Sequence, residues 1–92
     1  MSDAEIRHDA ERRRFETTAD GHVGHVEYER DGDRLVLTHT IVPSEIGGRG
    51  IAGALVRATL DHARAEGLKV VPACSYADVW MRRHPEYEDI RG

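Results

Sequence analysis

The connection Val42-Pro43-Ser44-Glu45-Ile46-Gly47-Gly48-Arg49-Gly50-Ile51-Ala52 decides the fold of this chain. It joins a β-type run that ends at Pro43 to a helical pattern that begins near Arg49. Glycines let a backbone approach a ligand closely, and the free N–H groups in the first turn of a helix favour an anion. The connection therefore predicts a turn that holds a phosphate-bearing molecule, although an ordinary glycine-rich connection has the same pattern.

The residues before this connection have the pattern of an antiparallel meander. From Val23 to Arg30 apolar and charged residues alternate, as they do in a strand with one buried face. Asp31-Gly32-Asp33 is a strong hairpin signal. The return run Leu35–Val42 carries apolar residues on both faces, which predicts burial on both sides. We expect strands over the ranges Arg14–Thr18, Val23–Arg30 and Arg34–Val42.

After the connection the hydrophobic period lengthens to three or four residues, which predicts one long helix. Gly67 is a stop signal for this helix, and Leu68–Pro72 has the pattern of a short strand. Because a strand–helix–strand unit makes a right-handed crossover, this strand should lie parallel to Leu35–Val42. A short helix is expected from Ser75 to about Arg83. The long helix should bury the stripe Ile51, Ala52, Leu55, Val56, Thr59, Leu60 and Ala63.

Together these patterns predict an α/β fold. Its mixed sheet of four or five strands would be an antiparallel meander followed by a parallel β-α-β crossover, with one long and one short helix. A length of 92 residues suits a single small domain. Residues 1–13 are charged and aperiodic, so we expect a flexible arm there and one domain over residues 14–92.

Composition argues against several classes of partner. A net charge of −4 gives no general attraction to nucleic acid or to an anionic membrane. No apolar run is long enough to span a bilayer, and the first residues lack the layout of a signal peptide, so we expect a cytoplasmic location. His22-x-x-His25 has a spacing seen in metal sites. Residues three apart on a strand point to opposite faces, however, so we expect two solvated histidines and no metal.

Two common phosphate motifs do not fit the glycines. Gly48-x-Gly50-x-x-Gly53 has the spacing of a dinucleotide fingerprint. That fold needs a parallel strand before the loop and an acidic residue at the end of the next strand, where Val71-Pro72-Ala73 stands instead. The chain is also too short for it. A nucleotide-hydrolase loop is excluded because no Lys-Ser or Lys-Thr pair follows the glycines.

The lone cysteine, Cys74, lies where a strand ends and a helix begins. A helix N-terminus lowers the pKa of a thiol and favours the thiolate. His39 is expected near the end of the parallel partner strand, where it can serve as the base that activates a nucleophile. The alternative is that Cys74 is a buried small apolar residue and that His39 is a hydrogen-bonded core residue.

Four motifs occur in order along the chain and resemble those of small single-domain GNAT-like acetyltransferases. This resemblance runs from about Arg14 to Tyr87. In its acetyl-CoA loop the family usually has Arg or Gln at the first position, where this chain has Gly47. The motifs are Thr38-His39-Thr40-Ile41-Val42-Pro43-Ser44, the loop Gly47-Gly48-Arg49-Gly50-Ile51-Ala52, Pro72-Ala73-Cys74-Ser75-Tyr76, and Arg83-His84-Pro85-x-Tyr87.

The resemblance implies the acetyl-CoA-binding half of the GNAT fold and acetyl-CoA-dependent N-acetyl transfer to an amine. It implies that Cys74 and His39 are the catalytic pair. It also implies that the loop N–H groups hold the pyrophosphate of acetyl-CoA, while the main chain of Val42 bonds the pantetheine arm. The implied acetyl-CoA contacts are Val42, Gly47, Gly48, Arg49, Gly50, Ile51 and Ala52.

The expected partners are acetyl-CoA and an amine acceptor, which is a protein, a peptide or a polyamine. Transfer through Cys74 is one expectation. The alternative is a CoA-binding regulatory or scaffold module with little catalysis, because the chain is short and has few residues with which to shape an acceptor site.

Overall fold

Five strands form one mixed sheet, in the order β1-β2-β3-β4-β5. The first four strands are antiparallel neighbours, and β5 pairs in parallel with β4. The computed structural model describes residues 5–92. The strands are β1 (Arg7–Asp9), β2 (Arg14–Ala19), β3 (His22–Asp31), β4 (Arg34–Ile41) and β5 (Lys69–Pro72).

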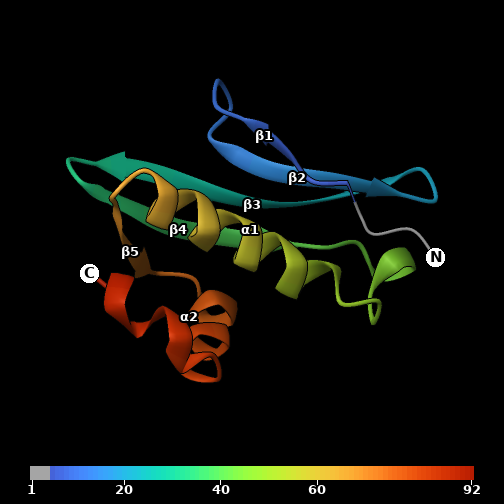
Figure 1. Cartoon of the computed structure of the whole chain (residues 1–92). Coiled ribbons are helices and arrows are strands. Elements are labelled where there is room, and N and C mark those ends of the chain that lie inside the picture. The colour runs from blue at the N-terminus through green and yellow to red at the C-terminus, as the bar shows by residue number, and fades with distance from the viewer. Residues whose placement is uncertain (1–4) are drawn as a thin grey trace.

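Two α-helices and two 3-10 helices complete the fold. Helix α1 lies along one face of the sheet, and α2 lies beyond the β5 edge (Figure 1). The predicted α/β fold, with its antiparallel meander and parallel crossover, is confirmed. The two 3-10 helices were not predicted. The helices are η1 (Ser44–Ile46), α1 (Ile51–Ala65), α2 (Ser75–Arg82) and η2 (Pro85–Ile90).

Strand β1 corrects the prediction of a flexible arm over residues 1–13. Its middle residue, His8, stacks on Phe15 with 4.2 Å between ring centroids. His8 Nε2 also lies 2.6 Å from the Tyr28 hydroxyl. Contacts of the His8 ring, together with the pairing of β1 with β2, therefore anchor a charged segment that has no hydrophobic period. Residues 1–4 of the predicted arm lie outside the described residues.

The core lies between α1 and the sheet. Helix α1 buries Ile51, Leu55, Val56, Thr59, Leu60 and Ala63. This is the predicted stripe without Ala52, which is only partly buried at the start of the helix. Opposite the stripe, the sheet buries Val26, Tyr28, Leu35 and Leu37. These apolar contacts hold α1 against the sheet.

A β-bulge interrupts the pairing of β3 with β4. Tyr28 pairs with Leu37, but its neighbour Glu27 pairs with His39, so Thr38 is an extra residue in β4. The Thr38 hydroxyl donates a hydrogen bond to the Glu27 carbonyl at 3.2 Å. This bond satisfies a carbonyl beside the interrupted ladder.

The bulge reverses which β4 residues face α1. Residues directly opposite each other in an antiparallel pair share a face of the sheet. Thr40 pairs with the fully buried Val26 and therefore lies on the α1 face, whereas His39 shares the outer face with Glu27. The predicted burial of Leu35–Val42 on both sides is wrong, because no described helix covers the outer face and Ile41 is 46% exposed there.

Helix α2 packs on α1 through a glycine. A Cβ atom added to Gly53 would lie 3.1 Å from Trp80 Nε1 and 3.5 Å from the Tyr76 hydroxyl. Trp80 is buried, whereas its neighbour Val79 is exposed. The close approach at Gly53 brings the start of α2 beside the first turn of α1.

Thr38→Val tests the bond that holds the bulge. The variant removes this side-chain hydrogen bond to the Glu27 carbonyl, so we expect the free energy of unfolding to fall by about 1 kcal/mol. Urea denaturation measures it. Thr18→Val is the matched control, because its hydroxyl only accepts a bond from the exposed Arg7. Equal stability of the two variants would contradict this role for Thr38.

Candidate functional site

The glycine-rich connection presents a run of free backbone N–H groups. The first helical bond of α1 joins the Ala54 N–H to the Gly50 carbonyl at 3.0 Å. Within residues 5–92, no backbone carbonyl accepts a bond from the N–H groups of Gly48 through Gly53. Gly48 and Gly50 have φ angles of 77° and 78°, which glycine adopts without strain. A run of N–H groups in such a turn favours an anion.

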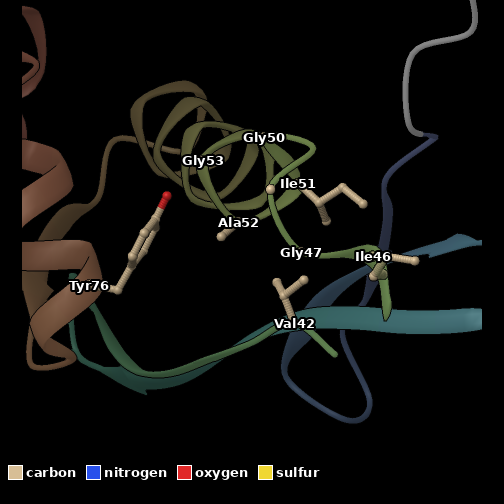
Figure 2. A pocket seen from close by; sticks show the side chains of 9 residues that line it. Val42, Ile46, Gly47, Gly50, Ile51, Ala52, Gly53 and Tyr76 are labelled. Atoms are coloured by element: carbon tan, nitrogen blue, oxygen red, sulfur yellow. The ribbon is translucent and has the colours of Figure 1, made fainter. Parts of the chain in front are cut away.

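These N–H groups border a cleft of about 290 Å³. Figure 2 shows Val42 on one side of the cleft and Tyr76 on the other, with the tyrosine hydroxyl directed toward the first turn of α1. The first turn of α1 contains no acidic residue that would repel an anion. The lining residues are Val42, Ile46, Gly47, Gly48, Gly50, Ile51, Ala52, Gly53 and Tyr76.

Most of the predicted loop residues line this cleft, but Arg49 does not. Its guanidinium Nη2 lies 2.6 Å from the Asp20 carboxylate, in the turn between β2 and β3. Its backbone N–H remains in the free run. Ile46, Gly53 and Tyr76 were not among the predicted binding residues. The closeness of Gly53 to α2 explains why Tyr76, a residue of α2, reaches the cleft.

Cys74 lies where the parallel pairing of β4 with β5 ends. Its N–H donates a bond to the Leu37 carbonyl at 2.9 Å, just beyond the last paired residues, Leu37 and Pro72. Cys74 is also the N-terminal cap of α2. Its position at the junction of strand and helix is as predicted.

The thiol of Cys74 has a polar partner, which is Thr40. The thiol donates a hydrogen bond to Thr40 Oγ1 at 3.4 Å. Burial raises the pKa of the Cys74 thiol. When the sulfur is ionised, the Thr40 hydroxyl and the backbone N–H groups of Ala77 and Tyr76 donate hydrogen bonds to the thiolate. These bonds outweigh burial, so the net pKa is lower than that of an ordinary thiol. More of this thiol is therefore ionised at neutral pH.

His39 does not contact Cys74. Its Nδ1 lies 3.5 Å from Glu27 Oε1, and its side chain is 63% exposed on the outer face of the sheet. The prediction that both residues lie together at the strand ends assumed regular alternation along β4. The extra residue at Thr38 shifts this alternation, so Thr40 takes the place beside the sulfur. The motif Thr38-His39-Thr40 contained the correct partner, but periodicity alone did not locate the bulge.

The prediction for the two histidines of β3 was only partly right. His25 was expected to be solvated, but only 14% of its side chain is exposed and its Nε2 lies 2.8 Å from Glu27 Oε2. Across residues 5–92, the structure contains no group of His, Cys, Asp and Glu side chains arranged to hold a metal ion. In the same part of the chain, neither α-helix has the length and apolar character needed to cross a membrane.

Comparisons with known proteins point to one family. Residues 14–90 match the model of a GCN5-related N-acetyl-transferase domain. Protein NATD1 of Homo sapiens is 40% identical over 83 residues, which cover 87% of this chain and 74% of that protein. Protein NATD1 of Danio rerio is 34% identical over 87 residues, which cover 89% of this chain and 79% of that protein.

A solved structure shares the fold. The solution NMR structure of a GCN5-like protein from Staphylococcus aureus matches with a TM-score of 0.78 and 28% sequence identity. The match covers 100% of this chain and 91% of that chain. The whole described fold, and not only the glycine-rich turn, is therefore common to both proteins.

The partner of Cys74 can be tested by thiol alkylation. Thr40→Val removes the hydroxyl that stabilises the thiolate, so we expect the pKa of Cys74 to rise and iodoacetamide alkylation at neutral pH to slow about fivefold. His39→Asn should leave the rate unchanged, because His39 lies on the other face. If His39→Asn raised the pKa as much as Thr40→Val, the assignment of Thr40 would be wrong.

Proposed function

Because the chain belongs to the GCN5-related N-acetyltransferase family, we propose that it takes an acetyl group from acetyl-CoA and transfers it to an amine. The proposal rests on the arrangement of two groups in the structure. Free N–H groups that suit an anion lie along the cleft from Gly48 to Gly53, and a thiol with a lowered pKa lies at the junction of β5 with α2. An acyl-CoA has an anionic pyrophosphate and a thioester joined by a long arm, so it matches both features.

The residues of the cleft fit the donor in chemical character. The pyrophosphate would bind the N–H groups of Gly48–Gly53 without any charged side chain. Val42 follows the last residue of β4, and its main chain would bond the amide groups of the pantetheine arm. The side chains of Ile46 and Ile51 give this part of the cleft apolar walls. The cleft therefore offers donors for the phosphates and an apolar surface for the arm.

Cys74 would act as a nucleophile. Its thiolate attacks the carbonyl carbon of the thioester, the C–S bond to CoA breaks, and CoA leaves as a thiolate. The product is acetyl-Cys74, which an amine then attacks. The lowered pKa of Cys74 favours this route, because the thiolate and not the thiol is the nucleophile.

A second candidate function is a CoA-binding module that regulates or scaffolds and catalyses little. The contacts of Cys74 favour it. Among residues 5–92, its side-chain hydrogen-bond partner is Thr40, which cannot accept and carry a proton as an imidazole can. In this case CoA would bind, but acetyl transfer to any amine would stay slow.

Cys74→Ala separates these functions. After incubation with acetyl-CoA alone, we expect intact-mass spectrometry to show one added acetyl group on the natural protein and none on Cys74→Ala. Calorimetry should show that both proteins bind CoA with similar affinity, because the phosphates would bind Gly48–Gly53 and not Cys74. Binding without an adduct would favour the CoA-binding module. Absence of binding would refute both functions.

Gly47→Gln restores a residue that the family usually has at this position. Gly47 has a φ of −68°, and an added Cβ would make only ordinary contact, at 3.4 Å from the Ser44 carbonyl. One new hydrogen bond to a phosphate should tighten CoA binding about fivefold by calorimetry. Gly48→Gln is the matched control, because its φ of 77° strains any side chain, and it should weaken binding. Weaker binding by Gly47→Gln would contradict the proposed position of the pyrophosphate.

A further inference from the structure

Two residues in the middle of the glycine-rich connection have no backbone anchor. The Gly47 N–H donates a bond to the Ser44 carbonyl at 3.1 Å, and the Gly50 carbonyl accepts the first helical bond of α1. Between these two bonds, Gly48 and Arg49 make no backbone hydrogen bond with any residue that the structure describes. Another contact must therefore fix the backbone of Gly48 and Arg49.

Packing does not fix this part of the connection either. A Cβ atom built on Gly48 or on Gly50 would have no atom within 4 Å. Both glycines have a positive φ, which is only one of the conformations open to a residue without a side chain. Holding them in a single conformation therefore costs more conformational entropy than holding other residues.

The side chain of Arg49 supplies an anchor. Its Nη2 lies 2.6 Å from the Asp20 carboxylate, and among residues 5–92 neither side chain has another ion-pair partner. The side chains of Arg49 and Asp20 are 48% and 66% exposed, and ion pairs with such exposure usually contribute little. The effect of this pair therefore depends on how firmly its carboxylate is held.

A tight turn holds that carboxylate. Asp20 and Gly21 are the two-residue connection between β2 and β3, because the residues on either side of them, Ala19 and His22, pair with each other. Asp20 and Gly21 have φ angles of 49° and 77°, as in the turns that match the twist of a hairpin. Since the backbone of Asp20 is fixed, forming the ion pair mainly requires that the Arg49 side chain be ordered.

The same hairpin contacts the glycine-rich connection at both of its ends. A Cβ atom built on Gly24 of β3 would lie 3.4 Å from the side chains of Val42 and Ile51, which begin and end the connection. The turn between β2 and β3 and the start of α1 lie at the same end of the molecule (Figure 1). The hairpin therefore supports the connection at its ends through Gly24 and at its middle through Asp20.

We propose that Asp20 is a positioning residue for the acetyl donor. Its ion pair with Arg49 holds the glycine-rich turn in the conformation whose N–H groups bind the pyrophosphate. This inference rests on the proposed acetyl transfer. Asp20 does not contact the donor and acts through Arg49, whose guanidinium stays on the carboxylate when the donor binds. A turn that is ordered in advance binds the anion without the cost of ordering it.

The first test measures the order of the turn without any ligand. Asp20→Asn keeps the size of the side chain and suits the left-handed turn, but it removes the charge. We expect the heteronuclear NOE of the Gly48 and Arg49 amide nitrogens to fall in this variant. Asp31→Asn is the matched control, because Asp31 also adjoins a hairpin turn and has no ion-pair partner within residues 5–92. Equal NOE values in the two variants would overturn the inference.

The second test follows acetylation of Cys74 by two donors. Asp20→Asn should raise the acetyl-CoA concentration that gives the half-maximal rate about threefold, while the maximal rate stays the same. S-acetylpantetheine has the same thioester and arm but no phosphate, so this loss should not appear with it. An equal loss with both donors would show that Asp20 supports the fold in general, and it would overturn the inference.

Arg49→Gln distinguishes the ion pair from a direct contact with phosphate. If the ion pair acts on the turn, then Asp20→Asn, Arg49→Gln and the double variant should weaken acetyl-CoA binding to the same extent, because each breaks the same pair. If the guanidinium bound phosphate itself, Asp20→Asn would free it and tighten binding, while Arg49→Gln would weaken binding. That result would overturn the inference.

The outcomes also separate this inference from the proposed function. If acetyl-CoA acetylated Cys74 equally well in Asp20→Asn and Asp31→Asn, Asp20 would have no role in donor binding, although the proposed function would stand. If acetyl-CoA did not bind the natural protein, the proposed function would fail, and the NOE measurement alone would decide whether Asp20 orders the turn.

Discussion

The extra residue at Thr38 is the constraint on which the candidate site depends. A regular β4 would direct His39 toward the helix face and Thr40 away from it. The bulge reverses both, so that Thr40 meets Cys74 and His39 meets Glu27. A single backbone irregularity thus assigns the polar partners of the Cys74 thiol and of the His39 ring, and the Thr38 hydroxyl donates a hydrogen bond to the Glu27 carbonyl beside it.

The glycine-rich turn and the cysteine belong to one crossover unit. The turn follows β4 and starts α1, and the cysteine follows β5 and starts α2, so both segments lie at helix N-termini. The close packing at Gly53 brings these helix starts together. In a family of N-acetyltransferases this unit provides, within a short chain, a turn with free backbone N–H groups and a thiol with a lowered pKa on adjoining elements.

Sequence patterns predicted the fold well and the site only in part. The α1 stripe and the Asp31-Gly32-Asp33 hairpin depend on local periodicity and turn chemistry, which a single sequence contains. Strand β1 was missed because contacts of the His8 ring and pairing with β2 hold it, and not a hydrophobic period. The pairing of Cys74 with His39 failed because a bulge depends on cross-strand hydrogen bonding, and no local pattern of residue types located it.

Nuclear Overhauser effects in solution test this account most directly, because they report which β4 side chains lie near Cys74. The account predicts contacts between the Thr40 methyl protons and the Cys74 β protons, together with contacts between the His39 ring and the Glu27 side chain. Contacts between the His39 ring and the Cys74 β protons would show that β4 alternates regularly and would contradict the account.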